Sequence, residues 1–402
     1  MKINKIKNLI FLILSAAIML GFTSCSAADD SSVSIMIASD THLLADSLEG
    51  DEVYVKSILT NDGRVQEYDT QLLKALVDKA NKLSPAALCI TGDLTFNGEK
   101  ESHRAVAEIL SQVNEGTKVL VIPGNHDCYN LKAYTYKDDD PKHIKSITYD
   151  DFKEIYASCG YEDAYSYDTE SLSYIWELSD KQWLIMLDTT LSSYNDLNGA
   201  NIVGGLVKDQ TMLWLEENLK YASENGIEVI TFSHHNLITH NVLFEKGYTL
   251  SNADKVLELF KLYGVKLNFS GHLHIQNIQQ QDGIYDIASG SILDYGNRYG
   301  LLEINKDSFV FSREMLKPGG EDISEYAFNT FCKKYEKRSP VNSLASELNA
   351  YYFDGDYSKI HELIKERPSE VDEIISAGNA YMGEVMNVPD IDQNYLTIPR
   401  GA

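Results

Sequence analysis

Five short apolar runs, each ending in a small polar cluster, constrain the fold of this 402-residue chain more than any other feature. Segments with the periodicity of amphipathic helices, at residues 69–83 and 103–113, separate the first three runs. Such alternation is typical of βαβ units around a buried sheet. The five clusters are Asp40-Thr41-His42, Gly92-Asp93, Gly124-Asn125-His126-Asp127, His234-His235 and Gly271-His272-Leu273-His274.

The remaining pattern extends this α/β alternation and then changes. We expect strands at residues 33–38, 86–90, 119–122, 173–178, 183–188, 228–232, 265–269, 284–289, 299–304 and 308–315. Helices are expected at residues 69–83, 103–113, 208–221 and 253–263. Beyond Pro318-Gly319-Gly320 the sequence carries only helical patterns. We therefore expect a main domain over residues 33–317 and a small helical C-terminal domain over residues 321–402.

The polar clusters have the composition of a metal site. Ligands of open α/β sheets bind at the carboxyl ends of the strands, so the five clusters are expected to meet at one edge. Carboxylates, an amide and imidazoles together suit first-row transition metals. If Asp93 bridges two ions, each ion has four protein ligands and keeps open positions for a hydroxide and a substrate. The seven candidate ligands are Asp40, His42, Asp93, Asn125, His234, His272 and His274.

Spacing within two of the clusters is expected to help the ligands converge. Residues i and i+2 of an extended strand point to the same side, which would bring together the pairs Asp40/His42 and His272/His274. The glycines at 92, 124 and 271 would allow tight turns beside the ions.

The ordered series D-x-H, GD, GNHD, H and GHxH over residues 33–315 resembles the calcineurin-like metallophosphoesterase family. The resemblance implies a four-layer α/β/β/α sandwich, in which helices flank two packed sheets. It places Asp40, His42, Asp93 and His274 on one ion, and Asp93, Asn125, His234 and His272 on the other. It also implies that His126 faces the substrate and that Asp127 orients the His126 imidazole.

The resemblance also implies a reaction, the hydrolysis of a phosphoester by a metal-bound hydroxide with two ions of manganese, iron or zinc. The stretch Gly92 to Gly98 is similar to the cyclic-nucleotide phosphodiesterase branch, and the helical C-terminus resembles that of some bacterial lipoprotein phosphodiesterases. Phe96 stands where purple acid phosphatases have a metal-binding tyrosine. We therefore expect a small phosphodiester as the substrate. A broad phosphomonoesterase or nucleotidase is the alternative enzyme, and a catalytically silent metal-binding surface lipoprotein is the alternative from another class.

The N-terminus has the features of an export signal. Lys2, Lys5 and Lys7 precede an apolar stretch too short for a membrane span, which predicts a signal peptide at residues 1–24. The run from Phe22 to Cys25 resembles a lipobox, which implies lipidation of Cys25, a tether over residues 25–32, and an extracytoplasmic, lipid-anchored protein of the cell envelope. An ordinary signal peptide with an incidental cysteine is the alternative.

Charge and cysteine content limit the partners. A formal net charge of -25 disfavours general nucleic-acid binding, because such a surface repels phosphate backbones. We expect a monomer that contacts the membrane only through its lipid. The other four cysteines, Cys89, Cys128, Cys159 and Cys332, show no metal-binding spacing and predict no particular disulfide.

Several residues keep two interpretations. His234 is favoured over His235 as the ligand, and Cys128 is not expected to be a nucleophile. Asp188 could support the site or end a strand, and residues 138–140 could form a solvated loop or a calcium site. The tyrosines within residues 129–136 and 149–167 could stack on a nucleobase or pack in the interior.

Overall fold

The computed structural model describes residues 32–50, 63–137, 141–338, 342–389 and 391–400. The expected signal peptide, Cys25 and nearly all of the tether lie outside the described residues, as does the acidic run at 138–140. Within the described parts of the chain, no helix is both long and apolar enough to cross a bilayer.

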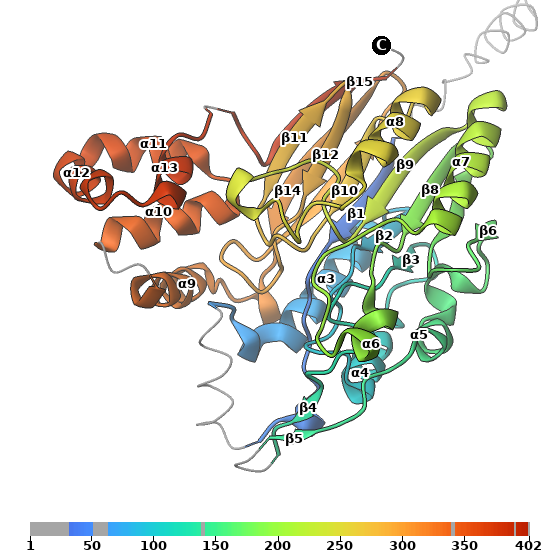
Figure 1. Ribbon diagram of the computed structural model, residues 1–402, viewed down its shortest axis with the longest axis horizontal. Coiled ribbons are helices and arrows are strands. Elements are labelled where there is room, and N and C mark those ends of the chain that lie inside the picture. The colour runs from blue at the N-terminus through green and yellow to red at the C-terminus, as the bar shows by residue number, and fades with distance from the viewer. Residues whose placement is uncertain (1–31, 51–62, 138–140, 339–341, 390, 401–402) are drawn as a thin grey trace, which may run out of the picture.

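The first of two large sheets contains the N-terminal strands (Figure 1). Its order is β15-β14-β13-β1-β2-β3. The strands are β1 Val33–Ala38, β2 Ala87–Ile90, β3 Lys118–Val121, β13 Arg298–Ile304, β14 Ser308–Met315 and β15 Tyr395–Pro399. β1, β2 and β3 run parallel, whereas β13, β14 and β15 join the sheet by antiparallel pairing.

The second sheet has the order β11-β12-β10-β9-β8-β7-β6. Its strands are β6 Ser166–Tyr167, β7 Tyr174–Ser179, β8 Gln182–Leu187, β9 Glu228–Ser233, β10 Leu267–Ser270, β11 Asn277–Gln281 and β12 Ile284–Ala288. The central strands β8, β9, β10 and β12 are parallel. A separate hairpin is formed by β4 Tyr134–Thr135 and β5 Lys142–His143.

Alternation along the strands separates the core into layers. In β1, Ile35 and Ile37 face the second sheet, where they pack with Phe232 and Phe269, while Met36 faces the helices on the outside. α3 Asp69–Leu83 and α4 Lys100–Leu110 cover the outer face of the first sheet. α7 Asp209–Glu224 and α8 Ala253–Tyr263 cover the outer face of the second. The predicted four-layer sandwich is confirmed.

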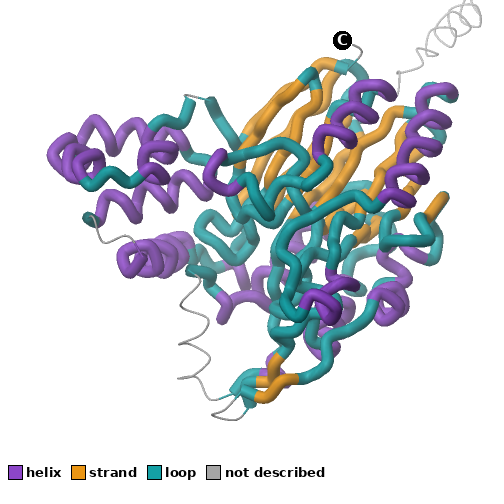
Figure 2. Tube along the Cα trace, in the orientation of Figure 1, coloured by secondary structure: helices purple, strands orange, loops and turns teal. Residues whose placement is uncertain are grey.

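Two short helices, α5 Tyr149–Ile155 and α6 Asn195–Asn198, lie in the loops beside the sandwich. Five more helices follow β14 and gather on one side of the strands (Figure 2). They are α9 Ser324–Arg338, α10 Ser343–Asp354, α11 Tyr357–Glu366, α12 Pro368–Ser376 and α13 Ala380–Met386.

The sequence pattern suggested that residues 321–402 are helical throughout. This is wrong, because strand β15 follows the last helix. This strand pairs with β14, and its Leu396 and Ile398 pack against the core between the sheets. The pairing covers backbone groups of β14 that an edge strand would expose. The boundary at residue 317 stays a prediction.

Candidate metal centre

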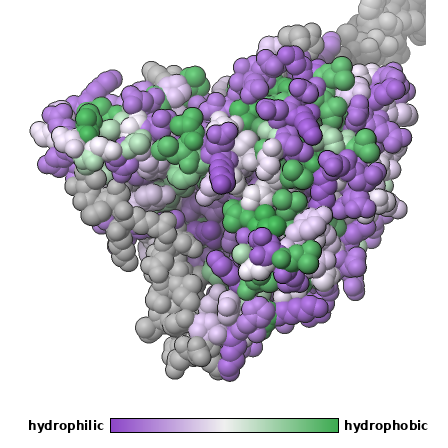
Figure 3. Space-filling model, viewed as in Figure 1, coloured by the Kyte–Doolittle hydropathy of each residue, from purple (hydrophilic) through white to green (hydrophobic). Residues whose placement is uncertain are grey.

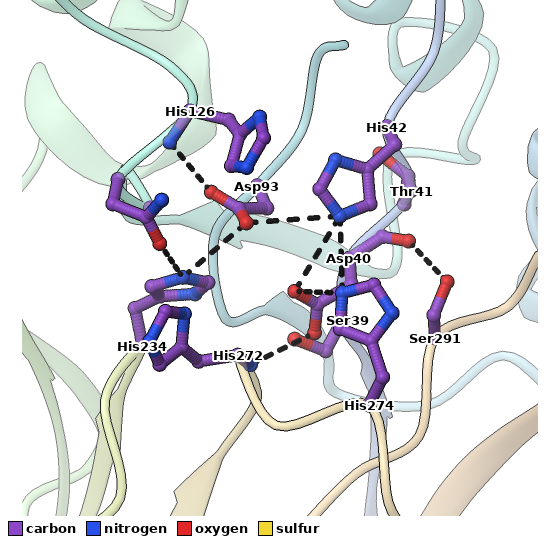
Figure 4. Close-up of polar contacts among 12 residues, drawn as sticks. Ser39, Asp40, Thr41, His42, Asp93, His126, His234, His272, His274 and Ser291 are labelled. Atoms are coloured by element: carbon purple, nitrogen blue, oxygen red, sulfur yellow. Dashed lines mark hydrogen bonds and ion pairs between the residues drawn. The ribbon is translucent and has the colours of Figure 1, made fainter. Parts of the chain in front are cut away.

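All seven candidate ligands follow strands at one end of the sandwich. Asp40 and His42 follow β1, Asp93 follows β2, and Asn125 follows β3 in the first sheet. In the second sheet, His234 follows β9, and His272 and His274 follow β10. The parallel strands of both sheets therefore deliver their terminal side chains to a common volume (Figure 4).

The first group consists of Asp40, His42, Asp93 and His274. Nε2 of His42 lies 3.8 Å from Oδ1 of Asp40, 3.6 Å from Oδ2 of Asp93 and 3.1 Å from Nε2 of His274. Nε2 of His274 lies 3.2 Å from Oδ1 of Asp40. One ligand atom from each of the four residues lies within 4.8 Å of all the others, so the group could hold a metal ion.

The second group consists of Asp93, His234 and His272, with Asn125 beside them. Nε2 of His234 lies 3.5 Å from Oδ2 of Asp93 and 3.1 Å from Oδ1 of Asn125. Ligand atoms of Asp93, His234 and His272 also lie within 4.8 Å of one another. The same carboxylate oxygen of Asp93 faces both His42 and His234, which is the position a bridging ligand would need.

Hydrogen bonds on the far side of three imidazoles determine which ring nitrogen faces the site. Nδ1 of His274 donates to Oδ2 of Asp294 at 2.8 Å, and Nδ1 of His234 donates to the Thr91 carbonyl at 2.9 Å. Nε2 of His272 donates to the Gly247 carbonyl at 2.9 Å, which leaves Nδ1 as its ligand atom. A carbonyl can only accept, so these contacts fix the protonated nitrogen and turn the lone pair of the other toward the site.

This arrangement fits a cation. With Nδ1 protonated, the Nε2 lone pair of His234 points at the Oδ1 acceptor of Asn125, a contact that needs a cation or a proton between the two atoms. Oδ1 of Asp40 is buried and, apart from its ion pairs with the His274 and His42 rings, has no hydrogen-bond partner among the described residues. Unsatisfied buried acceptors are costly, and bound metal ions would satisfy these.

In the metal-free protein, protons on two of the histidines take the place of metal ions. Burial disfavours the charged form of His234, but the charge of Asp93 outweighs it and raises the pKa of His234 to about 9. His274 is likewise desolvated, and Asp40 together with Asp294 raises its pKa to about 9. Burial and the charge of His234 lower the pKa of His272 to about 3. The site therefore holds protons at neutral pH that metal binding would displace.

We expected the i, i+2 alternation of an extended strand to bring together the two residues of the D-x-H pair and of the H-x-H pair. This explanation is wrong. Asp40 and His42 have φ of 53° and 38°, and His272 and His274 have φ of 65° and 60°. These residues adopt left-handed backbone rather than extended strand, so the i, i+2 alternation does not apply. Asp93 also has a positive φ, of 50°. Such backbone is unfavourable for non-glycine residues and clusters at functional sites.

Two of the three glycines also allow the close approach of a carboxylate. A Cβ at position 124 would lie 2.2 Å from Oδ1 of Asp93, and one at position 271 would lie 2.6 Å from Oδ2 of Asp40. Neither glycine has a positive φ, whereas Gly92 has a φ of 97°. The N–H of Asp127 donates to the Gly124 carbonyl at 3.3 Å, and the N–H of Leu273 donates to the Gly271 carbonyl at 2.7 Å, so both glycines begin tight turns. Of the three, only Gly92 needs the left-handed backbone that glycine allows.

His126 lies beside the metal groups, but Asp127 does not orient it. Nδ1 of His126 donates to the Phe96 carbonyl at 2.7 Å and lies 3.2 Å from Oδ1 of Asn97. The backbone N–H of His126 donates to Oδ1 of Asp93 at 2.8 Å. Among the described residues, no hydrogen bond joins the Asp127 carboxylate to the His126 ring, because that carboxylate turns inward. Phe96 and Asn97 therefore hold the imidazole.

The buried Asp127 carboxylate instead fixes the loop that carries Asp93. It accepts hydrogen bonds from the N–H groups of Leu94, Thr95 and Gly124 at 3.1, 2.9 and 2.8 Å. The hydroxyl of Thr95 donates to the same carboxylate at 2.9 Å. Asp127 thus joins the turn after β2 to the turn after β3.

The structure also decides between several alternative interpretations. The His235 ring nitrogens contact the Thr189 hydroxyl at 2.8 Å and the Val203 carbonyl at 2.9 Å, so His234 is the better placed ligand. Asp188 accepts from the N–H groups of Thr190 and Leu172 and shapes the end of a strand. Cys128 is buried, and desolvation raises the pKa of its thiol well above the ordinary value, which disfavours a nucleophilic thiolate.

A cavity of about 320 Å³ opens beside the metal groups. Its wall includes Asp93, Asn125, His126, His272 and His274. The other lining residues, which the sequence pattern did not reveal, are Arg64, Val203, Phe244, Tyr248, Leu273, Ile275, Asp294, Lys334, Tyr335 and Phe353. No tyrosine from the 129–136 or 149–167 loops is among the residues lining this cavity. Tyr156 and Tyr161 pack in the core instead.

Asp294 is the missed residue with the clearest role, because it holds His274. Burial alone would raise the pKa of Asp294, but the bond from His274 and the charges of Lys334 and Arg64 lower it. Asp294 lies in the loop after β12, outside the five motif clusters, so nothing in the spacing of those clusters indicates it.

The comparisons with known proteins agree with this geometry. Residues 33–276 match the model of the calcineurin-like phosphoesterase family. Two curated relatives, each called "Probable cyclic nucleotide phosphodiesterase", come from Vesicomyosocius okutanii subsp. Calyptogena okutanii and Ruthia magnifica subsp. Calyptogena magnifica. The first is 36% identical over 64 residues (16% of this chain, 27% of the relative) and the second 43% over 58 residues (14% and 24%). The chain thus matches only about a quarter of the length of each relative.

A solved structure shows the same fold. A dimetal phosphatase from Danio rerio superposes with a TM-score of 0.50 at 15% identity, covering 70% of this chain and 95% of the phosphatase. The family model spans more than half of the chain, and residues that could hold two metals lie together at the strand ends. The chain therefore belongs to the calcineurin-like phosphoesterase family.

Proposed function

We propose that the protein hydrolyses phosphodiesters at a dinuclear metal centre. The observation that carries this proposal is the shared carboxylate oxygen of Asp93, which faces both ligand groups beside the cavity that His126 lines. Asp40, His42, Asp93 and His274 would hold one ion, and Asp93, Asn125, His234 and His272 the other. Two bound ions supply an activated water and neutralise charge on the phosphoryl oxygens.

The protein's own residues orient these parts. Asp294, Thr91 and Gly247 fix the ring nitrogens of His274, His234 and His272. The bond from Nδ1 of His126 to Phe96 leaves Nε2 of His126 as the nitrogen available to the cavity. When Nε2 also carries a proton, His126 can donate it to the leaving oxygen of the substrate, a role worth about 10²–10⁴-fold in rate.

The preference for a diester, such as a cyclic nucleotide, rests on two supports. The curated relatives that match are named as probable cyclic nucleotide phosphodiesterases, and the stretch from Gly92 to Gly98 is similar to that branch. A comparison of kcat/KM for bis-p-nitrophenyl phosphate and p-nitrophenyl phosphate tests this preference. Faster turnover of the diester supports the proposal, and a strong preference for the monoester overturns it.

One observation favours a phosphomonoesterase or nucleotidase as the second candidate. Arg64 and Lys334 both line the cavity of a chain that carries a net charge of -25. Cations in addition to the metals favour a substrate with more negative charge, and a monoester dianion has more than a diester. The same pair of chromogenic substrates separates the two candidates.

If Mn²⁺-loaded protein hydrolyses neither substrate, a metal-binding surface protein replaces both enzyme proposals. Metal identity is addressed by elemental analysis of protein purified from its own source, where we expect manganese, iron or zinc. We further propose that the chain is an extracytoplasmic monomer held at the membrane by lipid on Cys25.

A further inference from the structure

The C-terminal helices form part of the cavity beside the metal groups. Lys334 and Tyr335 of α9 and Phe353 of α10 line it together with Phe244 and Tyr248 from the loop after β9. In the space-filling view the surface is hollowed between these helices and the sandwich (Figure 3). The cavity therefore has a catalytic wall from the strand ends and a second wall from elements outside the motif clusters.

The second wall is fixed to the catalytic wall by specific contacts. Leu273, between the two histidines that follow β10, and Ile275 pack into the same apolar cluster as Leu348 and Tyr352 of α10. The N–H of Gln276 donates to the Phe353 carbonyl at 2.8 Å. The position of Phe353 is thus set by the segment that carries His272 and His274.

Aromatic side chains dominate this second wall. The rings of Phe244 and Tyr248 lie 5.7 Å apart, and Tyr248 lies 5.0 Å from His272. The rings of Tyr335 and Phe353 lie 5.8 Å apart. All four aromatic residues are only partly buried, so their rings keep surface that a ligand can contact. Partly exposed aromatic rings beside a phosphate site are suited to stacking on a planar group.

Two basic residues adjoin the aromatic wall. A Cβ at position 63 would lie 2.7 Å from Cδ of Lys334, which shows how closely the 63–65 loop packs on α9. Arg64 of this loop and Lys334 line the same cavity. A guanidinium and an ammonium at this place provide donors for the anionic oxygens of a ligand.

We infer that Phe244, Tyr248, Tyr335 and Phe353 form a subsite for a nucleobase, and that Arg64 and Lys334 contact the phosphate oxygens of the same nucleotide. This inference rests on the proposed phosphoester hydrolysis and specifies its substrate class as nucleotides. The alternative role of these rings is packing against neighbouring aromatic residues, because the ring centroids of Phe353 and Phe331 lie 5.0 Å apart.

The experiment compares two ligands that differ only in the base, AMP and ribose 5-phosphate. Their binding to the Mn²⁺-loaded full-length protein is measured by calorimetry, so that the readout does not depend on turnover. We expect AMP to bind at least about tenfold more tightly, as base stacking would provide. Equal affinity of the wild-type protein for the two ligands overturns the inference.

Variants separate the aromatic contribution from the ionic one. Phe353→Leu keeps an apolar side chain but removes the ring, and should abolish most of the difference between AMP and ribose 5-phosphate. Phe331→Leu is the matched control, because Phe331 packs in the same aromatic cluster but does not line the cavity. If Phe331→Leu loses the difference in affinity between AMP and ribose 5-phosphate as fully as Phe353→Leu does, the result contradicts the subsite.

Arg64→Gln and Lys334→Gln should weaken both ligands by the same factor, about tenfold, and leave their ratio unchanged. Lys333→Gln, an exposed neighbour on α9, should change neither affinity. Thermal denaturation of every variant verifies folding. If wild-type protein discriminates between the ligands but hydrolyses no phosphoester, the proposed hydrolysis fails while the base subsite stands.

Discussion

Asp294 accepts a hydrogen bond from Nδ1 of His274 at 2.8 Å, and this bond turns Nε2 of His274 toward Asp40. Because the carboxylate sets both the tautomer and the ring orientation, Asp294→Ala should weaken metal binding by about 10–100-fold. Calorimetric titration with Mn²⁺ measures this loss. Asp282→Ala, which removes an exposed carboxylate paired with Lys261, is the control. Unchanged affinity in Asp294→Ala would show that His274 does not need this partner.

Removal of the shared carboxylate should have a different effect from removal of the cavity histidine. Asp93→Ala should abolish both metal sites together, because Oδ2 of Asp93 faces His42 and His234. His126→Ala should keep near-normal metal content and lower kcat by about 10²–10⁴-fold. Elemental analysis and steady-state kinetics measure the two quantities. Equal metal loss in both variants contradicts the assigned roles.

Metal binding should depend on pH through His234 and His274. Their pKa is raised to about 9, so in the metal-free protein each ring carries a second proton at neutral pH. Since a metal ion must displace these protons, affinity should rise as the pH increases from about 6.5 to about 9. Calorimetry at pH 7 in buffers with different ionisation enthalpies counts the protons released. A binding enthalpy that does not vary with the buffer argues against this coupling.

The same pKa values predict the stability of the metal-free protein. A histidine with a raised pKa in the folded state stabilises the fold fully below its unfolded value of about 6.5, and this contribution is lost as the pH rises through about 9. Urea midpoints of EDTA-treated protein should therefore fall between about pH 6 and about pH 9.5. Saturating Mn²⁺ should reduce this fall, because bound metal replaces the protons.

Asp127 should affect stability more than chemistry. Asp127→Ala leaves three buried backbone N–H groups without their acceptor, at a cost of about 1–3 kcal/mol for each unsatisfied group. Urea denaturation measures the loss. Under conditions where the variant is folded, its pH profile of kcat should match that of the wild type. A displaced profile would return Asp127 to a role in orienting the proton donor.

Cys25 should carry the lipid if the N-terminal interpretation is right. In cells fed an alkyne fatty acid, the wild-type protein should be labelled and sediment with membranes. Cys25→Ala should be unlabelled and soluble, because a protein without its acyl chains loses the apolar contact that anchors it. Labelling of Cys25→Ala to the wild-type level would place the lipid elsewhere.

The sequence predicted the α/β alternation closely, because buried strands and amphipathic helices have clear periodicities. The expected helices at 69–83 and 253–263 match α3 and α8 residue for residue. Strand β11 was not predicted, since Asn277–Gln281 is mostly polar and lies at a sheet edge. β15 was missed because its five residues, which follow a helical segment, are too few to show a clear strand periodicity.

The candidate ligands could be predicted from their positions after strands, but their environment could not. The D-x-H spacing indicated convergence, yet Asp40 and His42 adopt left-handed backbone. Their N–H groups donate to the Gly92 and Asp93 carbonyls, contacts between distant segments that the spacing does not indicate. Asp294, Arg64 and Phe353 reach the cavity from elements that carry no recognisable spacing. The partner of His126 was misassigned because the family resemblance implied Asp127, whereas the turn after β3 directs that carboxylate inward.

Because β15 pairs with β14, the five C-terminal helices are an insertion between two neighbouring strands of the sheet. Truncation after β14 would therefore remove an edge strand together with the helices and would confound any deletion experiment. Excision of residues 321–390, with a short loop joining the two antiparallel strands, would keep the sheet intact. It would also strip the cover from Leu273 and Ile275, so the shortened protein would need polar replacements there to stay soluble.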